Sequence, residues 1–464
     1  MQARAALIAA RAHFSLGDPV QGERQVKLAA KGPPEIAAEA TYAKARHLLR
    51  IHDNAAARKV MAQIDRRWPN TNAAKEAGFY AAWLDFQGGN LQRAVHSFAA
   101  YEKKYPRGRR RDDSMWFRAL SQLLLGQHLP ARATLQELAQ QFPSSLLVPQ
   151  ALYWAARAQQ LSGPGQDNAL EYQRLLAVFP ASFYGVLASQ RLRELGKPPV
   201  VAFPSPPSLP QPKLPSALDL SVALLRAGLH VDATLEIGTQ TSRVRGPAAA
   251  LEYGQALSSL GEFGAAFGIA TRSLWGKAYT EKNGEALALM YPRPFSSVVT
   301  PESQAAGIDP YLTWAIMRRE STFRPELISA ADARGLMQII PPTANGIAAL
   351  REEPAPEPDA LFSPALNVRY GAWYLGKLME RFGHPALAAA AYNAGPPASA
   401  RWAQEHGKHP LDLLVELVSY RETRAYIKQV VADLLVYRAL YETGGVLPPL
   451  SLEVPTPSAD GVKF

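Results

Sequence analysis

The 464-residue sequence contains no cysteine. This absence excludes a disulfide framework, a zinc site built from thiolates and a lipid anchor attached through a cysteine, and it suits an oxidising compartment. The sequence also lacks any run of eighteen or more apolar residues, so we expect no membrane-spanning helix. Its first residues interleave arginine with alanine instead of forming the apolar core of a signal peptide, so either a leader has been removed or export is not visible in this chain.

Signals for nucleic-acid binding are missing as well. There is no zinc-finger spacing, no aromatic strand of the RNP type and no helix-turn-helix pattern, so nucleic acid is not an expected partner. His406 and His409 have no third ligand nearby and are interpreted as part of a surface loop, so no metal is expected. The composition, 47% hydrophobic and 19% charged, is ordinary for a globular protein, and the length predicts two or three domains.

The formal charge of +10 is unevenly distributed. Residues 1–290 contain 34 Lys and Arg against 22 Asp and Glu, whereas residues 291–464 contain 16 against 18. The densest basic cluster runs from Lys103 to Arg111. It could meet a polyanion, such as an anionic membrane surface or the carboxylates of a cell-wall peptide, although a solvated turn between two helices is the simpler interpretation.

An aromatic residue followed by proline recurs every 37 residues in the first part of the chain. The four pairs are Trp68-Pro69, Tyr105-Pro106, Phe142-Pro143 and Phe179-Pro180. Pairs of aromatics, alanines and glycines recur in register with them, so each unit is predicted to form a helix, a glycine turn and a second helix that ends at the proline. Residues 1–196 therefore resemble a tetratricopeptide-like solenoid, in which the aromatics form the core.

The solenoid is followed by a segment that cannot be helical. Residues 197–215 contain eight prolines and are predicted to form an extended connector, either a strap or a linker. Helical patterns return in residues 216–290 as two or three further hairpins. A last domain, residues 291–464, holds all of the motifs described next and is expected to fold by itself.

The strongest candidate for chemistry lies between Tyr311 and Gly346. A helix that begins at Pro310 places Leu312, Ile316 and Glu320 at successive i+4 steps, so the Glu320 carboxyl continues an apolar stripe. Loss of water and the negative end of the helix dipole both favour the protonated carboxyl, which raises its pKa toward the value that a general acid needs. For a lone glutamate, a side chain that reaches water would be the simpler interpretation.

Short motifs after Glu320 favour a catalytic role for it over this simpler interpretation. They are Ser329, GLMQ at 335–338, AYNAGP at 391–396 and ETR at 422–424 with Tyr426. Each is weak alone, but their order and spacing resemble the soluble lytic murein transglycosylases, the Slt-type, lysozyme-like enzymes of glycoside hydrolase family 23. The resemblance covers residues 291–441. It implies an all-α protein in which a tetratricopeptide-like helical superhelix precedes a lysozyme-like catalytic domain.

The resemblance also implies roles for single residues. The expected catalytic residues are Glu320, Ser329, which would orient the Glu320 carboxyl, and Tyr392; the expected substrate-binding residues are Met337, Gln338, Asn393, Glu422 and Tyr426. Gln338 would donate an amide hydrogen bond to the glycan, and Met337 would form an apolar wall beside the acid. One position departs from the family pattern, because Asp332 stands where a small residue, commonly glycine, is usual. This departure puts the local backbone in doubt and adds a second carboxyl near the acid.

The implied reaction is cleavage of the β-1,4 bond between N-acetylmuramic acid and N-acetylglucosamine, with formation of 1,6-anhydromuramoyl ends and without a metal or organic cofactor. A lysozyme-type hydrolase on the same fold and a non-catalytic helical scaffold that binds the wall are the alternatives. The expected partners are peptidoglycan glycan strands and, through the solenoid, cell-wall synthesis proteins. We expect a monomer in the bacterial periplasm.

Overall fold

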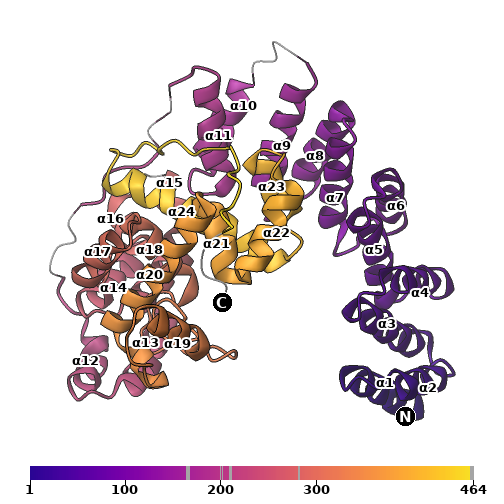
Figure 1. Ribbon diagram of the computed structural model, residues 1–464, viewed down its shortest axis with the longest axis horizontal. Helices are drawn as coiled ribbons and strands as arrows, with labels where there is room; N and C mark the ends of the chain where they lie inside the picture. The colour runs from indigo at the N-terminus through magenta and orange to yellow at the C-terminus, as the bar shows by residue number, and fades with distance from the viewer. Residues whose placement is uncertain (164–167, 199, 201, 208–211, 281–282, 460–464) are drawn as a thin grey trace. The chain divides into compact units, whose positions relative to one another are not determined.

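The computed structural model describes residues 1–163, 168–198, 200, 202–207, 212–280 and 283–459, and these contain 24 α-helices and two short 3-10 helices but no β-strand (Figure 1). The chain divides into two compact units, Met1–Glu171 and Tyr172–Phe464. Residues 199, 201 and 208–211 of the predicted connector lie outside the described residues.

The first unit is a row of helical hairpins, as the 37-residue period predicts. Its helices are α1 (Gln2–Ser15), α2 (Pro19–Ala29), α3 (Pro34–Arg50), α4 (Asn54–Arg67), α5 (Asn72–Gln87), α6 (Leu91–Lys104), α7 (Arg111–Leu124), α8 (His128–Gln141) and α9 (Val148–Leu161), and α10 (Ala169–Val178) crosses into the second unit. Gly89 and Gly126 have φ of 72°, a left-handed conformation that costs glycine little and that ends the first helix of a hairpin.

The aromatic pairs of the repeat form the core, which confirms that prediction. Phe79, Trp116 and Tyr153 are each at most 4% exposed, because a hairpin buries its apolar face only against its neighbours. The basic cluster is partly structural. Arg110 is half-buried, forms ion pairs with Glu76 at 3.3 Å and with Asp113 at 3.1 Å, and lies over the Phe79 ring. Arg110 therefore holds two repeats together.

After the end of α10, the second unit continues with α11 (Phe183–Glu194) and then with two sets of helices. The first set is the 3-10 helix η1 (Ser216–Leu218), α12 (Asp219–Arg226), α13 (His230–Arg243), α14 (Pro247–Ser259), α15 (Phe263–Thr280) and α16 (Gly284–Met290). The second set is α17 (Ser296–Ala305), α18 (Pro310–Glu320), α19 (Pro341–Leu350), the 3-10 helix η2 (Pro358–Phe362), α20 (Pro364–Phe382), α21 (Pro385–Ala394), α22 (Pro396–His406), α23 (Leu411–Leu417) and α24 (Arg421–Tyr441).

Helix α24 is the centre of the second set. Its apolar residues are buried along most of its 21 residues, and it packs against α18, α21 and α23. Helices α20 and α22 pack against α21, and α17 packs against α18 and α20, so residues far apart in sequence are brought together. None of the described helices is both long and apolar enough to cross a membrane.

Helix α11 packs with α24, although the sequence pattern groups residues 183–194 with the solenoid. The Tyr184 hydroxyl donates to Glu416 Oε1 at 2.6 Å, and Lys428 Nζ donates to Glu416 Oε2 at 2.8 Å. Arg191 forms an ion pair with Asp412 at 2.5 Å, and both side chains are buried. Because such polar groups pair only in three dimensions, the helical pattern of α11 could not reveal them.

The described part of the proline-rich segment packs against the residues that follow α24 in the same unit. The backbone N–H groups of Ala202 and Phe203 donate to the Gly445 carbonyl at 2.9 and 3.1 Å, and the Phe203 side chain is 1% exposed. These contacts are those of a strap tied to the residues after α24. The domain boundaries at 196, 215 and 290 remain proposals.

Candidate active site

Helix α18 places Glu320 at its last residue, and the local sequence explains why. Asp309 Oδ1 accepts a hydrogen bond from the Tyr311 N–H at 2.8 Å, which caps the first turn, and Pro310 fits that turn because it needs no donor. Leu312 is 2% exposed and Ile316 is fully buried, so the stripe that leads to Glu320 faces the core.

The Glu320 carboxyl is isolated from positive charge. Its Oε1 accepts a hydrogen bond from the Tyr426 hydroxyl at 2.5 Å. Burial raises the pKa of Glu320, the Tyr426 hydrogen bond lowers it and the negative charge of Glu422 raises it, and together they give a pKa of about 7. Arg318 and Arg319 point away from it, because both form ion pairs with Asp433, at 2.7 and 2.5 Å. At neutral pH the carboxyl is therefore poised to give and to take a proton.

Two tyrosines face this carboxyl from other helices. Tyr426 lies on α24, and Tyr392, near the end of α21, donates to the Met337 carbonyl at 2.7 Å. Burial raises the pKa of both tyrosines well above 10, and the charge of Glu320 adds to the effect. Both hydroxyls therefore stay protonated as donors. Beside them, Asn393 Oδ1 accepts from the Thr423 hydroxyl at 2.7 Å.

The GLMQ loop is held against α18 and α20 by two residues that sequence reasoning assigned no role. The Ser321 hydroxyl donates to the Leu336 carbonyl at 2.8 Å. Asn367, fully buried on α20, accepts from the Met337 N–H at 2.7 Å and donates to the Arg334 and Leu361 carbonyls at 2.9 and 2.8 Å. Such a buried amide, with three backbone partners, specifies one loop conformation.

This geometry agrees with the family comparison. Residues 297–414 match the family described as the transglycosylase SLT domain. The matched residues include Glu320, Tyr392 and Asn393. A soluble lytic murein transglycosylase of Salmonella typhimurium is 33% identical over 151 residues, which are 32% of this chain and 23% of the relative, and that of Escherichia coli K12 is 32% identical over the same lengths. The chain thus covers about a quarter of these curated relatives.

Solved structures extend the likeness in fold beyond the SLT domain. The lytic transglycosylase Slt of Pseudomonas aeruginosa has a TM-score of 0.68 at 21% sequence identity. The superposition covers 95% of this chain and 73% of the Pseudomonas chain. The 70 kDa soluble lytic transglycosylase of Escherichia coli has a TM-score of 0.67 at 19% sequence identity, and the superposition covers 99% of this chain and 74% of the Escherichia coli chain. These likenesses confirm the predicted fold class. Residues 34–198 also match the YfiO family, described as outer membrane lipoprotein.

Within the SLT domain, three predicted site residues lie differently from their expected roles. The Ser329 hydroxyl accepts from the Ala331 and Ala333 N–H groups at 3.2 and 3.0 Å and so closes a turn, and none of the hydrogen bonds among the described residues joins it to Glu320. Met337 is fully buried, so it lies beneath the site and forms no exposed wall. The Gln338 amide donates to the Leu327 and Gly335 carbonyls at 3.0 and 2.9 Å, which leaves its oxygen, not its N–H groups, for a ligand.

Backbone strain is concentrated in the same loop. Thr322, Phe323, Asp332 and Gln338 have φ between 49° and 62°, a left-handed region that costs a non-glycine residue on the order of 1 kcal/mol or more. The backbone at Asp332 has a positive φ, which glycine adopts at little cost. This explains why the resembled family commonly has glycine at this position. The Asp332 side chain is exposed and pairs with Arg334 at 2.9 Å. Asp332 is therefore no second acid in the site.

Gly335 combines positive φ with close packing, so we expect Gly335→Ala to lower the free energy of unfolding by about 2 to 4 kcal/mol. A Cβ atom there would lie 2.3 Å from the Leu361 carbonyl oxygen and 2.4 Å from Asn367 Nδ2. Gly307→Ala is the matched control, because Gly307 has a similar φ of 69° but open space around it, and should cost about 1 kcal/mol. Chemical denaturation measures both, and equal costs would contradict the role of close packing.

Proposed function

We propose that this protein is a peptidoglycan lytic transglycosylase in which Glu320 is the single general acid and base. The observation that carries the proposal is the buried Glu320 carboxyl, with a pKa raised to about 7 and two protonated tyrosines beside it. The names of the relatives support murein as the substrate class. Binding of the glycan strand by Asn393, Glu422 and the Gln338 oxygen, which lie around this carboxyl, is part of the proposal.

The reaction needs one carboxyl that acts twice. Protonated Glu320 gives its proton to the glycosidic oxygen as the bond from that oxygen to C1 of the muramoyl unit breaks, and the acetamido oxygen of the substrate stabilises the positive C1. The ionised carboxylate then takes the proton of the muramoyl 6-hydroxyl as that oxygen bonds to C1. The acid is regenerated, no water is consumed, and the product has a 1,6-anhydromuramoyl end.

The Tyr426 hydroxyl favours the first half of this cycle and orients the carboxyl for both halves. Its hydrogen bond to Oε1 stabilises the carboxylate after the first proton transfer, and it fixes which oxygen faces the substrate. Tyr392 is held by the Met337 carbonyl and keeps the GLMQ loop against α21. Burial of the carboxyl counteracts the hydrogen bond, so the pKa of Glu320 stays near the pH at which it works.

A hydrolase is the second candidate, and one observation favours it. The exposed Glu422 is near enough to Glu320 for its charge to raise the Glu320 pKa. A carboxylate on the far side of the sugar could activate water, which is what an inverting glycosidase requires. Asp332, which the sequence places as a second carboxyl near the acid, is a weaker candidate for this part than Glu422, because Asp332 is paired with Arg334.

Mass spectrometry of fragments released from purified sacculi tests the two candidates. We expect 1,6-anhydromuramoyl ends, about 18 daltons lighter than hydrated ends because no water is added. Glu422→Gln and Asp332→Gly should leave this product unchanged. Hydrated, reducing ends that disappear in Glu422→Gln would show a hydrolase instead, and absence of any released fragment would favour a non-catalytic scaffold.

We further propose that the protein acts in the periplasm. The soluble lytic murein transglycosylases to which it is similar and the outer membrane lipoprotein family matched by residues 34–198 support this location. Recruitment by cell-wall synthesis proteins through the solenoid and action as a monomer are parts of the same proposal. Fractionation of cells that produce the full-length protein, with a cytoplasmic and a periplasmic marker enzyme, tests the location.

A further inference from the structure

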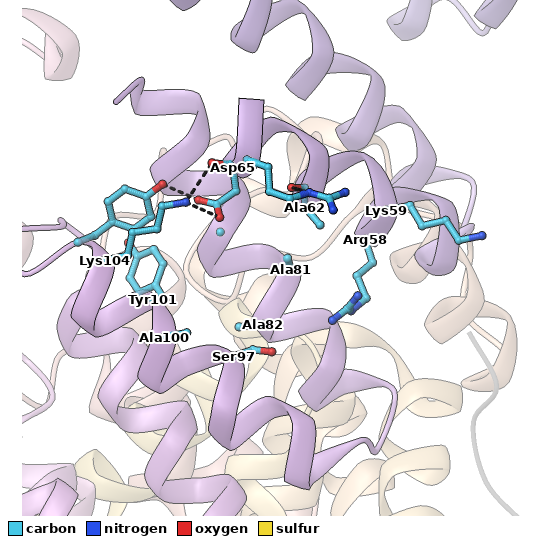
Figure 2. A pocket seen from close by; sticks show the side chains of 13 residues that line it. Arg58, Lys59, Ala62, Asp65, Ala81, Ala82, Ser97, Ala100, Tyr101 and Lys104 are labelled. Atoms are coloured by element: carbon cyan, nitrogen blue, oxygen red, sulfur yellow. Dashed lines mark hydrogen bonds and ion pairs between the residues drawn. The ribbon is translucent and has the colours of Figure 1, made fainter. Parts of the chain in front are cut away.

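The first unit has an open groove on the side of its even-numbered helices. Helix α5 packs against its odd-numbered neighbours α3 and α7, whereas α4 and α6 flank α5 and leave a cavity of about 480 Å³ between them. Figure 2 shows Ala81 and Ala82 on its floor, the Lys104–Asp65 pair at one end and Arg58 toward the other. The volume lies within the range of about 300 to 1,000 Å³ that is usual for ligand pockets.

The 37-residue repeat supplies a comparison within the same chain. At the position of Ala81, the following repeat has Arg118, and at the position of Ala100 it has Glu137. Arg118 crosses its own groove and pairs with Glu102 at 2.8 Å and with Glu137 at 3.8 Å. The preceding repeat has Lys44 at the same position, which pairs with Glu23 at 2.6 Å. A long cation thus bridges both neighbouring repeats, while the alanines leave the groove between α4 and α6 open.

The rim of this open groove is basic. Arg58, Lys59, Arg66 and Lys104 line it against one carboxylate, Asp65. Arg58 is held by the buried Asp85 at 2.5 Å and Lys104 by Asp65 at 2.7 Å. Lys59 and Arg66 are exposed, and the described residues form no ion pair with either. The whole unit, residues 1–171, contains 23 Lys and Arg against 14 Asp and Glu, so it attracts anions.

We propose that this groove binds an extended, acidic peptide segment of a partner protein. The small side chains of the floor let a peptide backbone approach, and carboxylates of the segment pair with Lys59 and Arg66. A sugar chain fits less well, because the aromatic rings that line the groove, Tyr101 and Tyr105, are 4% and 7% exposed and offer no face for stacking. This proposal is independent of the catalytic function.

A short fluorescein-labelled peptide of alternating glutamate and alanine is the probe, titrated with the full-length chain and followed by fluorescence anisotropy. We expect saturable binding that weakens as salt is added, because surface ion pairs are screened. Ala81→Arg combined with Ala100→Glu copies the plug of the next repeat and leaves the net charge unchanged. It should weaken binding about tenfold or more, since the cavity is filled.

A pair of charge variants decides the result even if the plugged variant folds poorly. Lys59→Glu with Arg66→Glu changes exposed groove residues and should weaken binding about tenfold. Lys103→Glu with Arg107→Glu makes the same change in net charge at exposed positions outside the groove and should leave most of the affinity. Thermal unfolding of each variant checks the fold.

Three outcomes would overturn the proposal. The first is absence of saturable binding to the native chain, and the second is equal loss in the two charge variants, which would indicate attraction by net charge alone. The third is a groove variant that loses sedimentation with purified sacculi while peptide binding is unchanged, because the occupant would then be murein. Turnover of sacculi should stay intact in all three double variants, so failure of this proposal is distinguishable from failure of the catalytic one.

Discussion

Glu320→Gln is expected to lower the rate of fragment release from sacculi by roughly two to four orders of magnitude, the usual contribution of a general acid or base. The amide has nearly the same shape as the carboxyl, so it can still accept the Tyr426 hydrogen bond, but it cannot give a proton to the glycosidic oxygen. Sedimentation of the variant with sacculi should be unchanged. The measurement is fragment release under initial-rate conditions.

The same variant should be more stable than the native protein at high pH. Because the folded-state pKa of Glu320 is raised to about 7 from 4.5, ionisation of the carboxyl destabilises the folded state. The native carboxyl therefore costs nothing below about pH 4.5, and its cost grows as the pH rises through 7. By linkage the cost reaches about 3 kcal/mol at most, so the gain in the free energy of unfolding should appear between these pH values.

Glu422→Gln is the matched control for both measurements, the rate of fragment release and the dependence of stability on pH. It removes an exposed carboxylate whose charge raises the Glu320 pKa, so we expect the alkaline limb of the activity profile, where Glu320 ionises, to move to lower pH while most activity remains. Glu320→Gln with more than a tenth of the native activity would refute Glu320 as the catalytic group. A stability difference that does not vary with pH would refute its raised pKa.

Removal of α11 is expected to destabilise the SLT domain strongly. The sequence motifs predict that residues 291–464 fold alone, but in the structure Asp412 and Glu416 are buried against Arg191 and Tyr184 of α11. Loss of one partner of a buried ion pair costs about 3 to 5 kcal/mol. Residues 168–464 should therefore unfold cooperatively, and residues 197–464, which lack α11, should melt at a much lower temperature or not fold.

A double-mutant cycle on the full-length chain isolates the cause. Arg191→Leu alone leaves the buried Asp412 carboxylate unpaired and should cost about 3 kcal/mol or more. Arg191→Leu combined with Asp412→Leu removes both charges and should recover most of that loss. Equal stability of the two truncated chains, or no recovery in the double variant, would show that α11 is not part of this domain.

Several features of the site are local and were therefore predictable. Asp309 and Pro310 start α18, and the i+4 spacing from Leu312 places Glu320 on the buried side of its last turn. Neither step requires a distant residue. The period of 37 residues likewise predicts stacked hairpins and a core of aromatic pairs, since each hairpin contacts only its neighbours.

Other features were decided by contacts between distant residues. Asn367 holds the GLMQ loop from another helix. With the left-handed backbone at Gln338, the N–H groups of its amide donate into the protein and only its oxygen is left for a ligand. Asp332 and Glu422 are both acidic in sequence, but only packing shows that Arg334 neutralises the first while the second acts on Glu320.

The sequence by itself determined the helices, the repeat, the family that the last domain resembles and the position of its buried glutamate, because periodicity, caps and motif spacing act within a few turns of chain. Only the tertiary structure decided what surrounds that acid and which helices support it. Burial, ion pairing and backbone strain depend on residues brought together from distant segments, such as Tyr426 beside Glu320 and Arg191 beside Asp412. The Tyr426 contact contributes to the Glu320 pKa, and the Arg191 contact joins α11, which also packs against α24, to α23.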